Sequence, residues 1–86
     1  MPYLKINQIQ EGMINVSLIA RVLENESLQE GKFKLLLEDG TGKVSLLSRE
    51  RYTVGTTLKI ERAYAYKFRG QLSISVMKKG KVSVIE

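Results

Sequence analysis

The sequence predicts an all-β protein, a small closed barrel of five principal strands with a short N-terminal helical or turn segment. Apolar and polar residues alternate with period two along several short runs, and glycines mark the connections between them. The length of 86 residues supports one modest core and therefore a single domain over residues 1–86. Closure is expected because so small a sheet would otherwise leave exposed edges.

The first half of the chain contains three predicted strands. The first covers residues 15–23, where every second residue is apolar. A polar, glutamate-rich turn at 24–31 leads into a second strand at 32–38. Residues 39–42 (DGTG) predict a hairpin, because aspartate and glycine tolerate positive φ angles and the aspartate side chain bonds nearby backbone N–H groups. The third strand then returns over 43–47.

The second half begins with a break in the alternation. Residues 48–52 are expected to form one helical turn, capped by the serine that begins it. The longest strand is predicted at 57–66, followed by another at 71–77. A basic turn at 78–81 is expected to precede a last apolar run at 82–85.

The N-terminal segment is predicted to cover one end of the barrel. Ile6, Ile9 and Met13 have the spacing of one face of a short helix or of a covering turn. These side chains are expected to plug the bottom of the barrel.

The longest strand contains a conflict at Arg62. Leu58 and Ile60 supply its inward face, and continued alternation would bring Arg62 into an apolar core. An unpaired charge is costly there. A bulge or strong bend near Arg62 would resolve the conflict.

The composition argues against most kinds of enzyme. The chain has no cysteine and no histidine, which excludes thiol catalysis, Ser-His-Asp triads and histidine metal sites. Asp39 is the single aspartate, so a paired-aspartate metal site is hard to build. We expect a protein that is not an enzyme and uses no metal or cofactor. No apolar run approaches membrane-spanning length, and we expect a cytoplasmic protein without membrane contact.

Positive charge is concentrated in the second half of the chain. The formal net charge is +5. Residues 1–42 contain four basic and six acidic side chains, a net −2, whereas residues 43–86 contain ten and three, a net +7. This distribution favours a polyanionic partner.

Three aromatic residues lie in this basic half. Tyr64, Tyr66 and Phe68 are interleaved with small and cationic residues such as Ala65 and Lys67. Alternate side chains of a strand share a face, so the three rings are expected to lie together. Rings for bases and cations for phosphates are the components of a single-stranded nucleic-acid site. At least two rings are expected to be exposed, with one in the core at the barrel end.

Four segments follow one another in a recognisable order: 37–44 (LEDGTGKV), 54–55 (VG), 58–64 (LKIERAY) and 68–72 (FRGQL). In this order they resemble archaeal single-stranded DNA-binding proteins of the OB-fold family, which includes replication protein A. The resemblance covers nearly all of the chain and implies an OB-fold barrel that binds single-stranded DNA.

The resemblance also suggests roles for individual residues. It implies that Tyr64 and Phe68 stack on bases and that Lys67 and Arg69 contact phosphates. Tyr66 is added from the strand alternation alone. One departure is the absence of tryptophan, which the family usually has at the end of the third strand.

The predicted function is sequence-tolerant binding of single-stranded nucleic acid, with DNA favoured over RNA, by stacking and phosphate neutralisation. Two alternatives stay open. One is an OB-fold protein–protein interaction subunit of a replication or repair complex, which the missing tryptophan supports, and the other is an RNA-binding barrel. The candidate binding residues are three rings and six cations: Tyr64, Tyr66, Phe68, Lys43, Arg49, Arg51, Arg62, Lys67 and Arg69.

Overall fold

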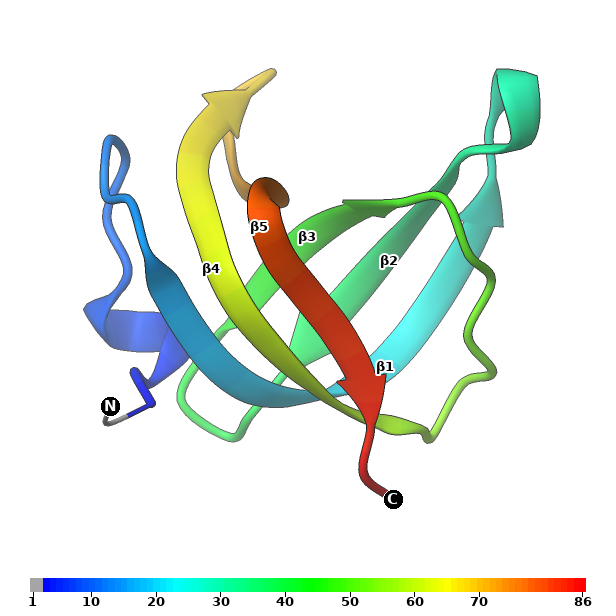
Figure 1. The fold of residues 1–86 in the computed structure, drawn as a ribbon, viewed down its shortest axis with the longest axis horizontal. Helices are drawn as coiled ribbons and strands as arrows, with labels where there is room; N and C mark the ends of the chain where they lie inside the picture. The colour runs from blue at the N-terminus through cyan, green and yellow to red at the C-terminus, as the bar shows by residue number, and fades with distance from the viewer. Residues whose placement is uncertain (1–2) are drawn as a thin grey trace.

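The computed structural model describes residues 3–86, which form five strands and two short 3-10 turns. The strands close into a barrel in the order β1-β2-β3-β5-β4 (Figure 1). The prediction of an all-β, five-stranded closed barrel is therefore confirmed. Within residues 3–86 no helix is long and apolar enough to cross a membrane. The elements are η1 (Ile6–Gln8), β1 (Val16–Ser27), η2 (Gln29–Gly31), β2 (Phe33–Glu38), β3 (Lys43–Ser48), β4 (Thr57–Phe68) and β5 (Gln71–Val84).

The seam that closes the barrel is a short parallel ladder between β3 and β5. It consists of two residue pairs, Ser45 with Ser73 and Leu46 with Ile74. All other neighbouring strands are antiparallel. Beyond the seam β3 and β5 separate, and this separation opens one of the surface grooves described below.

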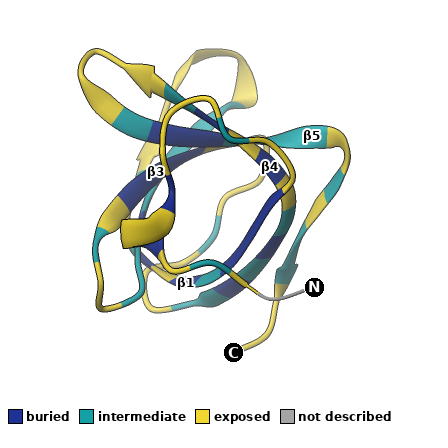
Figure 2. Cartoon of the chain, turned by 90° about the vertical axis from the view of Figure 1, so that its left-hand side faces the viewer, coloured by how far each residue is buried: buried dark blue, intermediate teal, exposed yellow. Residues whose placement is uncertain are grey.

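The core consists of alternate residues from all five strands. These side chains form one buried cluster. Figure 2 shows buried positions along the strands, whereas most turns and connections are exposed. The period-two alternation of the sequence therefore separates the inner from the outer face, as predicted. The largest fully buried side chains are Val16, Leu18, Val22, Leu35, Leu37, Val44, Leu46, Leu58, Ile60 and Ile74.

The N-terminal segment covers one end of the barrel, as predicted. Ile6 and Ile9 are buried members of the core, and Met13 is half-buried against it. The helical part is a single 3-10 turn, η1.

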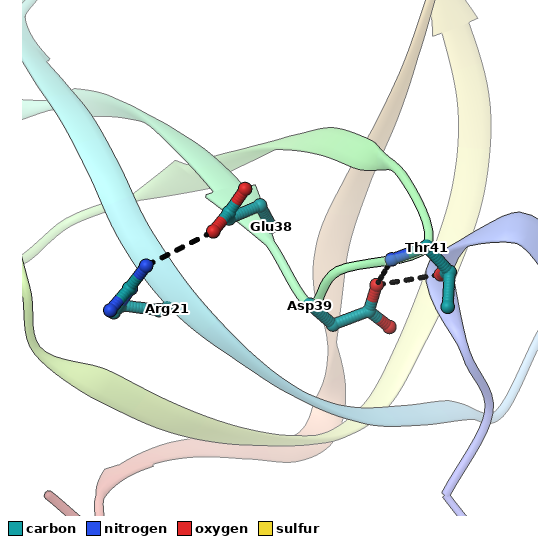
Figure 3. Close-up of polar contacts among 4 residues, drawn as sticks. All are labelled: Arg21, Glu38, Asp39 and Thr41. Atoms are coloured by element: carbon teal, nitrogen blue, oxygen red, sulfur yellow. Dashed lines mark hydrogen bonds and ion pairs between the residues drawn. The ribbon is translucent and has the colours of Figure 1, made fainter.

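The β2–β3 hairpin holds this segment in place. The Asp39 carboxylate accepts hydrogen bonds from the Ile6 N–H (2.8 Å), from the Thr41 N–H (2.9 Å) and from the Thr41 hydroxyl (2.6 Å), the latter two shown in Figure 3. Partial burial alone would raise the pKa of Asp39. These hydrogen bonds and the nearby Lys5 outweigh it, so the pKa lies below its ordinary value of 3.8.

The connection between β1 and β2 is shorter than the sequence predicts. The turn was expected at 24–31, but β1 continues to Ser27 and pairs with β2, with Glu26 opposite Lys34. The longer ladder also carries an exposed ion pair between Arg21 and Glu38, with 3.2 Å between nitrogen and oxygen (Figure 3).

The expected helical turn at 48–52 is wrong. The segment is a bend in which the Ser48 hydroxyl accepts a hydrogen bond from the Glu50 N–H at 3.0 Å. The serine thus closes a tight local turn instead of capping a helix. The Asn25 side-chain amide donates to the Tyr52 carbonyl at 2.7 Å and fixes the segment against β1.

The basic turn predicted at 78–81 is also wrong, because these residues belong to β5. The β4–β5 ladder passes from the pair Glu61–Lys81 directly to the pair Ala63–Val76. Residues 77–80 therefore lie opposite Arg62 alone. The local sequence is typical of a turn, but β5 continues through it because β5 pairs with β4 on both sides of residues 77–80.

The bulge predicted at Arg62 is confirmed. Arg62 has a φ angle of +58° and the ladders to both neighbouring strands shift there. Its N–H points toward the Ser17 hydroxyl oxygen at 3.4 Å. Gly80 lies so close that a Cβ atom there would stand 2.4 Å from the Glu61 carbonyl oxygen and 2.5 Å from that of Arg62.

Candidate nucleic-acid interface

The bulge turns the aromatic row to the outside of the barrel. Beyond Arg62 the inner positions of β4 are taken by Ala63 and Ala65, both buried. Tyr64 and Phe68 are 42% and 56% exposed. Two exposed rings agree with the prediction.

No ring of the row belongs to the core, however. Tyr66 is half-buried on the outer face, so the expected core ring is wrong. The two alanines fill the inner positions that a ring would have taken.

The three rings differ in their surroundings. The Tyr64 and Tyr66 ring centroids are 5.5 Å apart at an interplanar angle of 34°. The Tyr66 hydroxyl lies 3.0 Å from the Ser75 hydroxyl on β5. The Arg69 guanidinium lies 5.2 Å from the Phe68 ring centroid, within the range of a cation–π contact. Tyr66 is thereby fixed, while Tyr64 and Phe68 present most of the exposed ring surface.

Tyr64 borders a groove with a volume of 580 Å³, which we call the Tyr64 groove. It lies where β3 and β5 separate, between the β3–β4 connection and the outer face of β4 and β5. Three cationic residues, Lys32, Arg49 and Lys81, line it together with one acidic residue, Glu50. The groove therefore combines an exposed ring with net positive charge.

Phe68 borders a second depression, the Phe68 groove, which consists of two adjoining hollows of 480 and 160 Å³. It lies between the β1–β2 connection and the β4–β5 hairpin. Leu28, Phe68 and Arg69 line only the larger hollow. Glu26, Lys34 and Gln71 line both, and Glu24, Leu36 and Ser45 line only the smaller.

Two of the six predicted cations lie at these grooves, Arg49 in the first and Arg69 in the second. Lys67 is exposed, but it alternates with Tyr66 and Phe68 and so belongs to the other face of β4.

The other three predicted cations line neither groove. Arg51 is exposed in the β3–β4 connection, and Arg62 lies at the bulge. Lys43 begins β3, whereas Arg49 follows its end, so about 20 Å of extended chain separates them.

Sequence reasoning missed Lys32 and Lys81. Lys32 precedes β2, and Lys81 lies in the segment that was read as an ordinary charged turn. They reach the Tyr64 groove because the barrel closes and β5 continues past the bulge. No local pattern in the sequence indicates this.

The β3–β4 connection that carries Arg49 also contains an internal side-chain hydrogen bond. The Tyr52 hydroxyl donates to the Glu50 carboxylate at 3.4 Å. Burial, together with the neighbouring Glu50 charge, raises the pKa of Tyr52 above its ordinary value of 10.0. The phenol therefore stays protonated at neutral pH and keeps its donor. Within residues 3–86 no cluster of three or more acidic residues could hold a metal ion.

Comparison with known proteins finds likeness in structure and not in sequence. The chain matches no protein-family model, and no curated protein matches it. The OB domain of Ta0387 from Thermoplasma acidophilum has a TM-score of 0.79 at 20% identity, covering 96% of this chain and 86% of that one. The protein has an OB fold.

Two further structures carry names that refer to replication or DNA. The replication factor A related protein from Methanobacterium thermoautotrophicum has a TM-score of 0.74 at 16% identity, over 99% of this chain and 92% of that one. The p202 HIN1 domain, solved with a 12-mer double-stranded DNA, has a TM-score of 0.75 at 12% identity. That match covers 98% of this chain and 45% of the HIN1 chain. At these identities the likeness shows the fold alone.

Proposed function

We propose that the protein binds single-stranded nucleic acid, with DNA as the favoured ligand, on the outer face of β4 and β5. The observation that carries the proposal is the exposure of Tyr64 and Phe68, each beside a groove that contains cationic side chains. Stacking of one base on an aromatic side chain contributes about 1–3 kcal/mol. The two rings are four residues apart on one strand, which separates them by about 13 Å.

The exposed ring surfaces favour a single strand over a duplex. Bases in a duplex are already stacked on one another, whereas those of a single strand offer free faces to Tyr64 and Phe68. Stacking tolerates any base, so the binding is expected to depend weakly on sequence at these two positions. Lys32, Arg49 and Lys81 would neutralise phosphates around Tyr64, and Arg69 would do so beside Phe68.

The test is fluorescence anisotropy of a labelled twelve-nucleotide oligo-dT, titrated with protein at several salt concentrations. Four phosphate contacts predict that log K falls against log salt with a slope of about −3. Tyr64→Ala/Phe68→Ala is expected to weaken binding by about tenfold or more. Tyr3→Ala is the matched control, because Tyr3 is 41% exposed and lies outside both grooves.

The outcomes separate the competing functions. Absence of binding at low salt would refute the proposal and would favour a protein partner for the exposed rings, since tyrosine and arginine are enriched at interface hot spots. Equal losses of affinity for oligo-dT in the double variant and in Tyr3→Ala would exclude stacking of bases on Tyr64 and Phe68. Competition with oligo-rU tells whether RNA is the better ligand.

A further inference from the structure

The smaller hollow of the Phe68 groove contains acidic side chains, which a simple phosphate-binding groove would not have. Glu24 and Glu26 lie on the outer face of β1 and line it, with Lys34 on the neighbouring strand. Lys34 lies opposite Glu26, but among residues 3–86 the close ion pairs are Arg21–Glu38 and Lys81–Glu61, so neither carboxylate forms a close ion pair with Lys34. They are free to act on a ligand.

The hollow has the size of one six-membered ring. Its volume is 160 Å³, and an engineered protein cavity of about 150 Å³ holds one benzene molecule. Ser45 lines it and is only 4% exposed. Within the described residues the Ser45 hydroxyl makes no side-chain hydrogen bond, unlike the hydroxyls of Ser17, Ser48 and Ser75. Since no buried side-chain nitrogen or oxygen atom of the described residues lacks a hydrogen-bond partner, the unpaired Ser45 hydroxyl is accessible, and the hollow offers it as well as the carboxylates.

These groups distinguish one base from another. An ionised carboxylate only accepts hydrogen bonds, so it binds an amino group and repels a phosphate or a carbonyl oxygen. Cytosine presents its N4 amino donors at the position where uracil and thymine present the O4 acceptor. The Gln71 amide and the Lys34 ammonium are donors for the remaining acceptors of the cytosine ring.

We propose that the smaller hollow of the Phe68 groove is a base pocket that selects cytosine over uracil and thymine. The N4 amino group donates to Glu24 or Glu26, and the repulsion of phosphates by these carboxylates turns the backbone toward Arg69 at the hairpin. The inference rests on the proposed function, and it adds a base preference at one position of an otherwise tolerant site.

The test compares the affinities of dC8 and dU8 at pH 7.5 by anisotropy, because these oligomers share backbone and ring size. The wild-type protein is expected to bind dC8 about fivefold or more tightly than dU8. In Glu24→Gln/Glu26→Gln the ratio is expected to fall to near one without a loss of affinity for dU8, since an amide both donates and accepts. Ser45→Ala is expected to reduce the ratio in the same direction.

The control is Glu11→Gln/Glu86→Gln, which changes the net charge equally at two exposed positions outside the groove. It is expected to keep the preference for dC8. Equal affinities of the wild-type protein for dC8 and dU8, or an equal loss of preference in both double variants, would overturn the base pocket and leave the proposed function intact. Failure of both oligomers to bind at low salt would overturn both.

Discussion

Addition of one methyl group at Gly80 is expected to disturb the barrel strongly. The Cβ atom of Gly80→Ala would stand 2.4 Å and 2.5 Å from the carbonyl oxygens of Glu61 and Arg62, and 2.5 Å from Cγ1 of Val76. Favourable contacts between heavy atoms lie at about 3.5–4.0 Å. Val76 can move aside, but the two carbonyl groups belong to the backbone of β4 at the bulge. One of the two strands must therefore shift by about 1 Å.

Overpacking of this kind costs about 1–3 kcal/mol, and the backbone location of both oxygens puts Gly80→Ala at the upper end. In a domain of this size each kcal/mol lowers the Tm by about 4–8 °C. A decrease of about 12–24 °C is therefore expected in thermal unfolding followed by circular dichroism.

Gly12→Ala is the comparison variant. No atom lies within 4 Å of the added methyl there, but the φ angle is +93°, so its cost is limited to backbone strain of about 1–2 kcal/mol. The double variant Val76→Ala/Gly80→Ala should recover little stability, because the carbonyl oxygens remain. If Gly80→Ala unfolds at the same temperature as Gly12→Ala or above it, the conclusion that β4 and β5 are too close at the bulge to admit a side chain at position 80 is refuted.

Two further predictions concern the β2–β3 hairpin and the bulge in β4. Asp39→Ala removes the acceptor of three hydrogen bonds and is expected to lower the free energy of unfolding by about 1–3 kcal/mol. Because folding lowers the Asp39 pKa below 3.8, the contribution of ionised Asp39 is complete above about pH 5 and is lost as the pH falls through the lowered value. Urea titrations of both proteins at pH 7 and pH 3 should therefore differ more at pH 7, and an equal difference would contradict the role of the charge. Arg62→Gly is expected to stabilise the protein by about 0.5–1 kcal/mol, because the φ angle of +58° strains arginine and not glycine. A lower urea midpoint for this variant would show that the arginine side chain contributes more than the strain costs.

Local patterns were sufficient to predict the architecture. Alternation located β2 and β3, and the sequence of residues 39–42 located the hairpin between them. The bulge was predictable because Arg62 conflicted with the inward phase of Leu58 and Ile60. These inferences succeeded because each depends on neighbours in the sequence.

Features that depend on distant parts of the chain were not predictable. Residues 78–81 read as a turn, but they belong to β5, whose pairing with β4 resumes at Val76 and at Lys81 on the two sides of residues 77–80. Lys32 and Lys81 line one groove because β3 and β5 pair over only two residues and diverge beyond them. The predicted set of cations included Lys43 because the sequence does not show which end of β3 faces the groove. Lys43 begins the strand, and the groove lies beyond its other end.

The bulge at Arg62 lets one continuous strand both fill the core and display aromatic rings on the surface. Residues before it alternate in one phase and fill the interior, and residues after it alternate in the other phase and display Tyr64 and Phe68. Without the bulge, alternation in the phase of Leu58 and Ile60 would bring Arg62, Tyr64 and Tyr66 inside and put the alanines outside. Conversely, with Arg62 in place, positions 64 and 68 can vary in evolution or in the laboratory at little risk to the interior. The residues displayed on the surface after the bulge can therefore change while the core of the barrel stays the same.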